Sequence, residues 1–370
     1  MRLSAVCLAL LAGCGEALPA PEAADVAGLA HAQGQGLSGK QLFEQELFQG
    51  NGRVCATCHL EASGAIGPDD IEAAWQADPG DPLFRALDSD DGTGASYDRL
   101  RTDATFRIRI DLPPNVTLVD DPSATQVELF RGASTVVNNP GLEVLFMQDG
   151  RNATLQEQAL GAVNAHFEPG RQPTVAELDA IAQHEQTKDE FYSSNAMKQW
   201  ERTGRPVSLP PGTTPEEIRG AAWFDSSSPD GVCAHCHSGP YLNETGVFLQ
   251  APLPPGSRFF TALVSEFNTA GTALQTFAFA DPSDPSAPPV IVESPDPGRA
   301  LITGDPNDAN FFRIPTVWGA VDTAPYFHDN SAADLQALMD HYQAYFQVVI
   351  GLTLTEQDKA DIIAYLQLLR

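Results

Sequence analysis

Two short stretches of the chain share one spacing of residues that can do chemistry, a Cys-x-x-Cys pair followed at once by histidine. The first is VCATCH at 54–59 and the second is GVCAHCH at 231–237. Thiols at this spacing can add to the two vinyl groups on one edge of a porphyrin, and the next imidazole can then reach the iron. The sequence therefore predicts two covalently bound c-type haems, attached through Cys55, Cys58, His59, Cys233, Cys236 and His237.

The use of cysteine supports this interpretation. Of the six cysteines, only Cys7 and Cys14 lie outside the motifs, and both are in the opening residues. A thioredoxin-like redox pair would not need the histidine, and a zinc site would need further paired ligands. An exported chain normally forms disulfides, but no spare pair exists here. Stability must then come from a packed core and from the groups that the motifs bind.

The opening residues MRLSAVCLALLAGCGEA contain an apolar run at 3–12. The run is shorter than the ~20 residues of a membrane-spanning helix, so we expect a secretory signal. Residues 11–14 resemble the bacterial lipobox, whose cysteine is lipidated and becomes the mature N-terminus. We expect a lipoprotein signal peptide at 1–14, a lipid anchor at Cys14 as the only membrane contact, and a flexible linker at 15–36. The expected location is the periplasm, on the outer membrane; the alternative is an ordinary signal peptide cleaved nearby.

The chain is strongly acidic, with a formal net charge of −28. Nucleic acid is excluded as a partner, because no basic cluster exists to face phosphates. The charge would suit a basic protein partner, and it is equally consistent with a soluble acidic surface.

Each haem motif follows a pattern that starts a helix. SGKQ at 38–41 is a capping box, and TPEE at 214–217 is another with proline at the first helical position. A helix, a short loop and C-x-x-C-H form the start of a small helical cytochrome c domain. We therefore expect a mainly α fold with two tandem cytochrome c-like haem domains and long loops, at 37–205 and 206–370.

An internal repeat lies outside the haem motifs. Residues 130–155 read FRGASTVVNNPGLEVLFMQDGRNATL, and residues 312–335 read FRIPTVWGAVDTAPYFHDNSAADL. The copies share an FR start, a TV pair and an aspartate, which is Asp149 in the first and Asp329 in the second. A helix is expected after each copy. This repetition supports two related haem domains in tandem.

The helices that follow the two copies differ at one position. Counted from the shared aspartate, Tyr342 falls opposite Ala162. Tyrosine can ligate haem iron, whereas alanine cannot. If this position faces the distal side of each haem, the second iron is six-coordinate and the first is open. The histidines agree, because none of the eight lies between His59 and His166.

With these features the chain resembles the bacterial di-haem cytochrome c peroxidase and MauG superfamily, and most closely its MauG-type (MbnH-like) members. The resemblance covers nearly the whole chain from about residue 38. Its best marks beside the haem motifs are MQDGRNATLQEQALGAV at 147–163 and FFRIPTVWGAVDTAPYFHD at 311–329. It implies a di-haem peroxidase-type oxidoreductase.

The resemblance also implies roles for individual residues. Gln158 matches the distal glutamine, and Glu168 matches the distal acid that assists cleavage of the peroxide O–O bond. Tyr342 matches the distal ligand of the second haem, which is methionine in ordinary peroxidases and tyrosine in MauG-type enzymes. The backbone carbonyls of Thr323 and Pro325 match two ligands of a calcium ion between the domains.

Three alternatives stay open at this level. His166 is a second candidate for the distal acid–base group. Met339 lies three residues before Tyr342 and can face the same side of the helix, so it could ligate the second iron instead. Gln148 stands where the family has a tryptophan thought to relay electrons between haems. Residues that could replace that relay are Trp75, Trp223 and Trp318.

The sequence thus favours a MauG-type reaction. Hydrogen peroxide is expected to react at the open first haem, and the oxidising equivalents are expected to be stored over both haems and used on a tryptophan or tyrosine of a partner protein. The first alternative is a cytochrome c peroxidase that reduces hydrogen peroxide to water with electrons from a small redox carrier. The second is a di-haem electron carrier without catalysis, which requires both irons to be six-coordinate.

Overall fold

The computed structural model describes residues 36–249, 253–268 and 273–370. The predicted signal peptide, the lipid anchor at Cys14 and all but the last residue of the linker at 15–36 lie outside the described residues. Residues 37–370 form one compact unit. In the part of the chain that the structure describes, no helix is both long enough and apolar enough to cross a bilayer.

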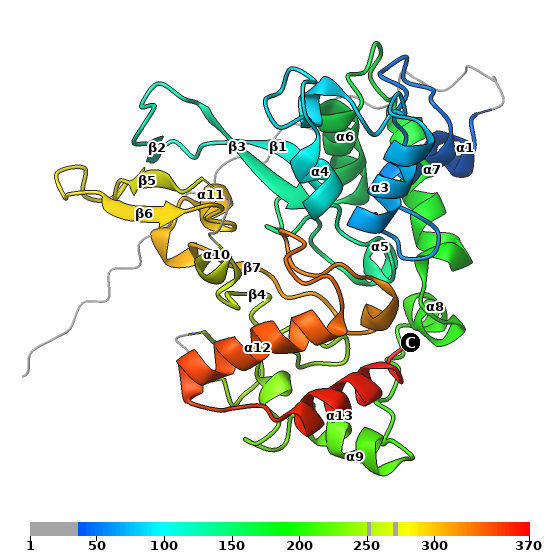
Figure 1. Ribbon diagram of the computed structural model, residues 1–370, viewed down its shortest axis with the longest axis vertical. Helices are drawn as coiled ribbons and strands as arrows, with labels where there is room; N and C mark the ends of the chain where they lie inside the picture. Colours follow the sequence, from blue (N-terminus) through cyan, green and yellow to red (C-terminus); the bar gives the residue numbers. More distant parts are fainter. Residues whose placement is uncertain (1–35, 250–252, 269–272) are drawn as a thin grey trace, which may run out of the picture. The chain divides into compact units, whose positions relative to one another are not determined.

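Helices are the main regular elements (Figure 1). Those before residue 205 are α1 (Gly39–Glu44), α2 (Cys55–Cys58), α3 (Pro68–Ala77), α4 (Asp98–Asp103), α5 (Asn139–Leu142), α6 (Leu155–His166), α7 (Val175–Thr187) and α8 (Asn195–Thr203). Those after it are α9 (Pro215–Ala222), α10 (Val264–Phe267), α11 (Ala300–Thr303), α12 (Leu335–Ile350) and α13 (Glu356–Leu366).

Both predicted capping boxes are present. The Ser38 hydroxyl accepts the N–H of Gln41, and the Gln41 side chain accepts the N–H of Ser38, so α1 begins where the sequence indicates. Thr214 and Glu217 start α9 in the same way. Further capping boxes start α6 and α7, and each satisfies amide groups that would otherwise lack partners.

The helix before each haem motif crosses a later helix closely, and a glycine permits each crossing. A Cβ at Gly39 of α1 would lie 2.0 Å from the Ala180 carbonyl oxygen of α7. A Cβ at Gly220 of α9 would lie 2.1 Å from the Asp361 carbonyl oxygen of α13. The two halves therefore build the same pair of crossed helices around their motifs, α1 with α7 and α9 with α13 (Figure 1).

Within the described residues, seven short strands make the fold mixed rather than mainly α. They are β1 (Thr105–Asp111), β2 (Val116–Leu118), β3 (Gln126–Gly132), β4 (Phe259–Phe260), β5 (Gln275–Phe279), β6 (Val290–Ser294) and β7 (Phe312–Arg313). They form three antiparallel sheets, β1–β3, β2–β5–β6 and β4–β7. The expectation of a mainly α fold is therefore confirmed only in part.

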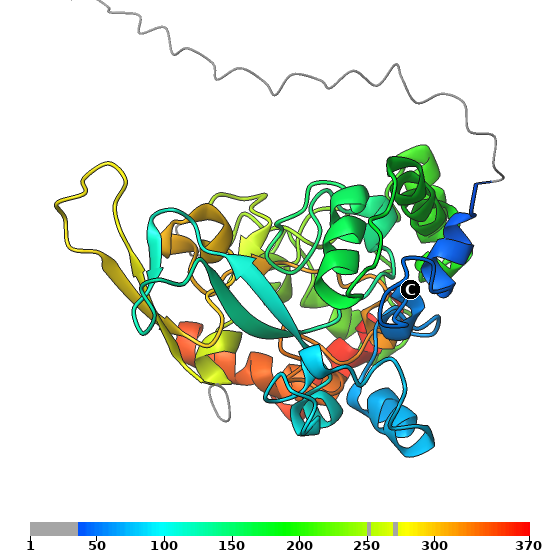
Figure 2. The same ribbon diagram turned by 90° about the horizontal axis from the view of Figure 1, so that it is seen from above.

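The sheets link distant parts of the chain. β2 pairs with β5, although some 160 residues separate them in sequence. β1 lies beside α6, where the Phe106 and His166 ring centroids are 6.3 Å apart. The connection between β5 and β6, drawn in yellow, extends away from the rest of the unit (Figure 2).

The largest apolar cluster contains residues from both sides of the predicted domain boundary. Phe43 and Met197 come from the first half, and Phe224, Met339 and Tyr365 come from the second. A smaller cluster of α1, α6 and α7 residues lies beside the first haem motif. The two halves share a core, and the boundary at 205/206 stays a prediction.

Candidate functional site

Each C-x-x-C-H motif lines its own cavity. The first cavity is lined by the motif at 55–59 and encloses about 1180 Å³, part of it open to solvent. The second cavity is lined by the motif at 233–237 and encloses about 1810 Å³, also partly open. All four motif cysteines are free thiols, which here stand for the sulfur atoms of the expected thioether links.

The two motif histidines are oriented in the same way. Nδ1 of His59 lies 2.9 Å from the Gly64 carbonyl oxygen, and Nδ1 of His237 lies 3.0 Å from the Leu242 carbonyl oxygen. A carbonyl at this distance accepts an Nδ1–H, which leaves the Nε2 lone pair free for a metal. Burial lowers the pKa of both imidazoles, which favours the neutral form that ligates iron.

Matching threonines fix both loops and establish the register of the repeat. The Thr135 hydroxyl donates to the Ser63 carbonyl at 2.8 Å, and the Thr316 hydroxyl donates to the Tyr241 carbonyl at 2.6 Å. Ser63 and Tyr241 each lie eight residues after the first cysteine of their motif. The repeat seen in the sequence is therefore a repeat in structure.

The first cavity is closed on one side by α6. The α6 residues that line it include Gln158, Ala159, Ala162 and His166. Residues 158, 162 and 166 are one helical turn apart and share one face. That face carries an amide, a methyl group and an imidazole, so it leaves space in the middle and polar groups at both ends.

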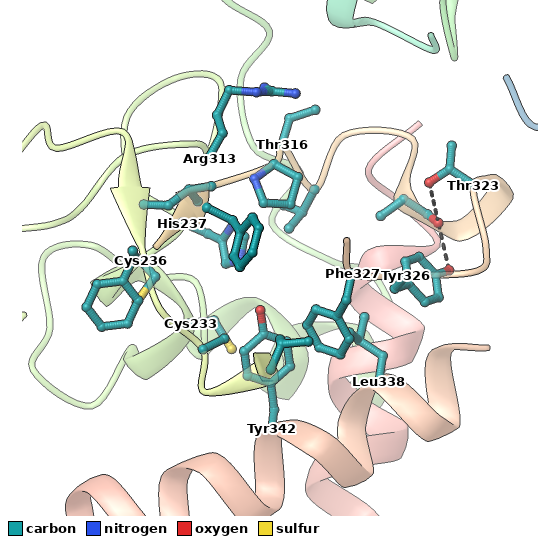
Figure 3. A pocket seen from close by; sticks show the side chains of 18 of the residues that line it. Cys233, Cys236, His237, Arg313, Thr316, Thr323, Tyr326, Phe327, Leu338 and Tyr342 are labelled. Carbon is teal, nitrogen blue, oxygen red and sulfur yellow. Dashed lines mark hydrogen bonds between the residues drawn. The ribbon is translucent and has the colours of Figure 1, made fainter. Parts of the chain in front are cut away.

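The second cavity is closed by the matching face of α12. Leu338, Met339, Tyr342 and Phe346 line it, each 180 residues after its counterpart on α6. Figure 3 shows Tyr342 rising from α12 with its hydroxyl directed into the cavity, on the side opposite His237. Ala162 and Tyr342, which the repeat places at matching positions in the sequence, therefore occupy matching positions in the structure. Ala162 faces the first cavity and Tyr342 faces the second.

Tyr342 and Met339 both reach the second cavity, so both alternatives for its ligand have structural support. Met339 is 4% exposed and belongs to the large apolar cluster. Burial, together with the nearby Cys236 and Cys233, raises the pKa of Tyr342 far above its usual range. An iron centre would act in the opposite direction, because a metal ion favours the anionic form of its ligand.

The donor set fits a covalently bound haem in each cavity. Each contains two thiols, one oriented imidazole and mostly apolar walls, and the second also offers a phenol across from the imidazole. A large apolar prosthetic group would fill these cavities and complete the core.

Glu168, which matches the family's distal acid, does not line the first cavity. α6 ends at His166, and the buried Phe167 ring packs against Phe48. Glu168 follows with a left-handed backbone (φ 47°), and its exposed carboxylate accepts a hydrogen bond from Asn51 Nδ2 at 2.9 Å. The turn at the end of α6 therefore directs this acid toward solvent, and His166 takes the position facing the cavity.

One wall is common to both cavities. Its residues are Ala133, Ser134, Thr135, Asn139, Gln148 and Arg313. Gln148 lines both cavities, and its carbonyl accepts the N–H of Arg313 at 2.7 Å. No aromatic side chain belongs to this common wall. Of the three tryptophans considered as relays, Trp318 lines the second cavity only, and Trp75 and Trp223 line neither.

A buried ion network lies behind this wall. Arg131 bonds both oxygens of Asp296 at 2.6 and 2.9 Å, and it reaches Asp149 at 2.6 Å. Arg151 also bonds Asp149 at 2.6 Å. Burial alone would raise the pKa of Asp149, but the charges of Arg131 and Arg151 outweigh it and hold that pKa below its usual range. Arg131 and Arg151 line the first cavity, so its electrostatics depend on this network.

Sequence reasoning missed Glu185 of α7. It is 4% exposed, lines the first cavity, and burial raises its pKa to about 8. Its Oε2 has no hydrogen-bond partner among the described residues. The helical period of α7 could have indicated that this position is buried, but not that it faces a cavity.

The predicted calcium ligands lie beside the second cavity. Thr323 and Pro325 line it, and the Thr323 hydroxyl donates to the Ala320 carbonyl at 3.2 Å (Figure 3). Among the described residues no group of three or more His, Cys, Asp or Glu side chains is arranged to hold a metal ion. Calcium bound by backbone carbonyls stays a prediction.

Comparison with known proteins supports the resemblance seen in the sequence. The chain is 22% identical over 261 residues to cytochrome c551 peroxidase of Nitrosomonas europaea. The aligned segment covers 64% of this chain and 64% of the relative. It is 26% identical over 158 residues to cytochrome-c peroxidase IdrP1 of Pseudomonas sp. (strain SCT), which covers 41% of this chain and 39% of the relative. The chain thus spans less than two thirds of the length of either relative. No family model matches it.

Two solved structures are also similar. A MauG-like protein associated with microbial copper homeostasis has a TM-score of 0.49 and 20% identity, over 90% of this chain and 86% of that one. The di-haem peroxidase BthA of Burkholderia thailandensis has a TM-score of 0.43 and 17% identity, over 90% and 84%. Both curated relatives are cytochrome c peroxidases, in agreement with the resemblance seen in the sequence.

Proposed function

We propose that this chain, a relative of the bacterial cytochrome c peroxidases, is a di-haem oxidoreductase that reacts with hydrogen peroxide at an open first haem. One observation carries the proposal. Equivalent turns of α6 and α12 face the two cavities, and they present Ala162 to the first and Tyr342 to the second. A methyl group leaves room for a small substrate, whereas a phenol can occupy the ligand position.

The protein's residues supply attachment, orientation and a shaped cavity. His59 and His237 would present their Nε2 atoms to the two irons, and the motif cysteines would hold the macrocycles. Haem itself supplies the capacity to give up electrons when peroxide is cleaved. Gln158 lies one turn from Ala162 and can hydrogen-bond an oxygen of bound peroxide. The positive charges of Arg53 and Arg151, which also line the cavity, favour negative charge on that oxygen.

The finer proposal is a MauG-type use of the two oxidising equivalents. An anionic tyrosine ligand favours a higher oxidation state at the second site, so one peroxide can leave an equivalent at each site. The target would be a tryptophan or tyrosine side chain of a partner protein, reached by long-range electron transfer. The net charge of −28 would attract a basic partner.

Mixing the ferric holoprotein with one equivalent of hydrogen peroxide, without an electron donor, tests this proposal. Optical spectra that change at both haems together, with no prior reduction, are the expected result. No reaction until one haem has been reduced would contradict the MauG-type reaction.

The second candidate is a cytochrome c peroxidase fed by a small redox carrier. Met339 favours it, because this methionine is buried and lines the second cavity. A thioether ligand raises the haem potential and suits electron uptake from a carrier. An iron–methionine charge-transfer band that survives in Tyr342→Phe would select this candidate.

Location and calcium are part of the same proposal. We propose that the chain is exported and anchored to a bacterial membrane through Cys14, with one calcium held by the carbonyls of Thr323 and Pro325. Metabolic labelling with a fatty acid in wild type and Cys14→Ala tests the anchor. Loss of labelling in the variant supports it, and equal labelling in both would exclude Cys14.

A further inference from the structure

His166 is a side chain in the first cavity that needs an explanation. It is the last residue of α6, and its ring lies against the edge of Phe106. Its backbone carbonyl accepts a hydrogen bond from Asn51 at 2.9 Å, which fixes the end of the helix. Its Nδ1 is buried and has no hydrogen-bond partner among the described residues. A buried imidazole nitrogen without a partner is costly unless something else satisfies it.

The spacing on α6 indicates what that could be. Gln158, Ala162 and His166 follow each other at four-residue intervals on the face that lines the cavity. In the second cavity the middle position is held by Tyr342, the ligand that the proposed function assigns to the second iron. Gln158 and His166 therefore stand on either side of the space left by Ala162.

We propose that His166 is the distal acid–base group of the first haem, acting on peroxide in the space beside Ala162. This inference rests on the proposed reaction with hydrogen peroxide. It assigns to His166 the role that the family resemblance gave to Glu168, which lies outside the cavity and is tied to Asn51.

The proton balance is simple. An O–H bond of hydrogen peroxide breaks, and the proton passes to a ring nitrogen of neutral His166. When the O–O bond breaks, its electron pair leaves with the far oxygen, which takes the same proton and departs as water. The oxygen left behind needs two electrons, and the two bound haems would supply them. His166 returns to its neutral state, so no net proton is consumed.

The surroundings of His166 suit this role. Burial lowers its pKa to about 4, so the ring is neutral at physiological pH and can accept a proton. The charged and titratable groups that act on it are Asp88, Arg53, Arg151 and His59. Asp88 alone favours the protonated ring, and the other three oppose it. The proton is therefore held weakly and is easily returned.

Position argues against His166 as an iron ligand. It matches Phe346 on α12, one turn beyond Tyr342. One turn of helix is a rise of about 5.4 Å, which offsets His166 from the ligand position. A base in this position would lie beside the open side of a bound haem without occupying the ligand position.

The test compares two small probes on the ferric holoprotein. Hydrogen cyanide is protonated at neutral pH and must lose its proton to bind as the anion. Nitric oxide binds without losing one. Association rates of both, and of hydrogen peroxide, are measured by stopped-flow absorbance in wild type, His166→Phe, His166→Gln and Glu168→Gln. The phenylalanine variant copies Phe346, and Glu168→Gln is the matched control.

The proposal expects the cyanide and peroxide rates to fall by about 100-fold in both His166 variants, with the nitric oxide rate unchanged. Equal loss for all three probes would mean that His166 only shapes the cavity, and it would overturn the proposal. Unchanged rates in the His166 variants, or a fall in Glu168→Gln instead, would also overturn it.

Electron paramagnetic resonance (EPR) separates the remaining possibilities. A first haem that is high-spin in wild type and in both His166 variants supports the proposal. A low-spin first haem that becomes high-spin in His166→Phe would show that His166 is a ligand and would overturn it. A wild type that binds neither probe and ignores peroxide would instead contradict the proposed function, which distinguishes the two failures.

Discussion

The helices α6 and α12 hold equivalent positions beside the two cavities, but they carry different side chains there. Each helix begins at a cap that lies eight residues after the first residue of a short β-bridge, Phe146 with Asn152 in the first half and Tyr326 with Ala332 in the second. Only the α6 cap is a complete capping box. From that common frame one helix presents glutamine, alanine and histidine, and the other presents leucine, tyrosine and phenylalanine. On α6, polar groups on both sides of an open space can bind a small polar substrate. On α12, a phenol among apolar groups can serve as a permanent ligand of the iron. Two copies of one scaffold can therefore divide binding and electron storage.

The largest effect is expected from making the first helix like the second. In Ala162→Tyr the new phenol should fill the space beside the first iron. We expect the rate of reaction with hydrogen peroxide to fall by at least about 1000-fold, because substrate access and the polar contacts are both lost. Stopped-flow absorbance measures the rate.

Gly161→Tyr is the matched control for that variant. The Cβ of residue 161 would meet nothing within 4 Å, so the same side chain there points into open space. Its rate should stay within about twofold of wild type. Equal loss in both variants would mean that the effect comes from disturbing α6 rather than from closing the site.

The second comparison concerns the aspartates shared by the repeats. Asp149 is fully buried and paired with two arginines, whereas Asp329 is only partly buried and accepts from Ser331 and Asn268. Removing one partner of a buried ion pair costs about 3–5 kcal/mol. Chemical denaturation should therefore show that loss in Asp149→Asn and less than about 1 kcal/mol in Asp329→Asn. Equal losses of unfolding free energy in the two variants would show that the two aspartates do not differ in their contribution to stability.

The same network predicts a pH dependence. The pKa values of Asp149 and Asp296 are held below their usual range by Arg131, against the effect of burial. Groups with a depressed folded pKa stabilise the protein above the unfolded pKa of about 3.9 and lose that contribution as pH falls through the folded pKa. The free energy of unfolding should decrease below about pH 4, and less steeply in Asp149→Asn. Identical slopes would exclude Asp149 from the effect.

A smaller effect is expected from Gln158→Leu, which copies Leu338 of α12. One hydrogen bond to peroxide is lost, worth about 1–1.5 kcal/mol, so the peroxide rate should fall by about tenfold. Gln156→Leu is the control. Gln156 lies on the same helix as Gln158, but its side chain donates a hydrogen bond to Asp179 of α7 at the protein surface. A tenfold loss in the control as well would assign the effect to helix stability.

The smallest effect is expected from Glu168→Gln. The carboxylate is exposed and bonds Asn51, so the peroxide rate should stay within about twofold of wild type. A loss of tenfold or more would show that the end of α6 rearranges to bring Glu168 to the first haem.

Sequence patterns predicted the parts of the site that are local in the chain. The attachment residues are contiguous, the capping boxes need only four residues, and Tyr342 and Ala162 follow from counting within a repeat. The position of Glu168 was not predictable, because Asn51, 117 residues away, sets the direction of the turn. The pairing of β2 with β5 and of Arg131 with Asp296 depends on similarly distant contacts. His166 was visible as a candidate, but the cavity was needed to favour it.

The proposed function requires that the first iron is open and that Tyr342 closes the second. Low-temperature EPR of the ferric holoprotein, in wild type and Tyr342→Phe, tests it most directly. We expect one high-spin and one low-spin haem in wild type, no iron–methionine charge-transfer band, and loss of the low-spin signal in the variant. Two low-spin haems in wild type, or a low-spin signal that persists in Tyr342→Phe, would contradict it.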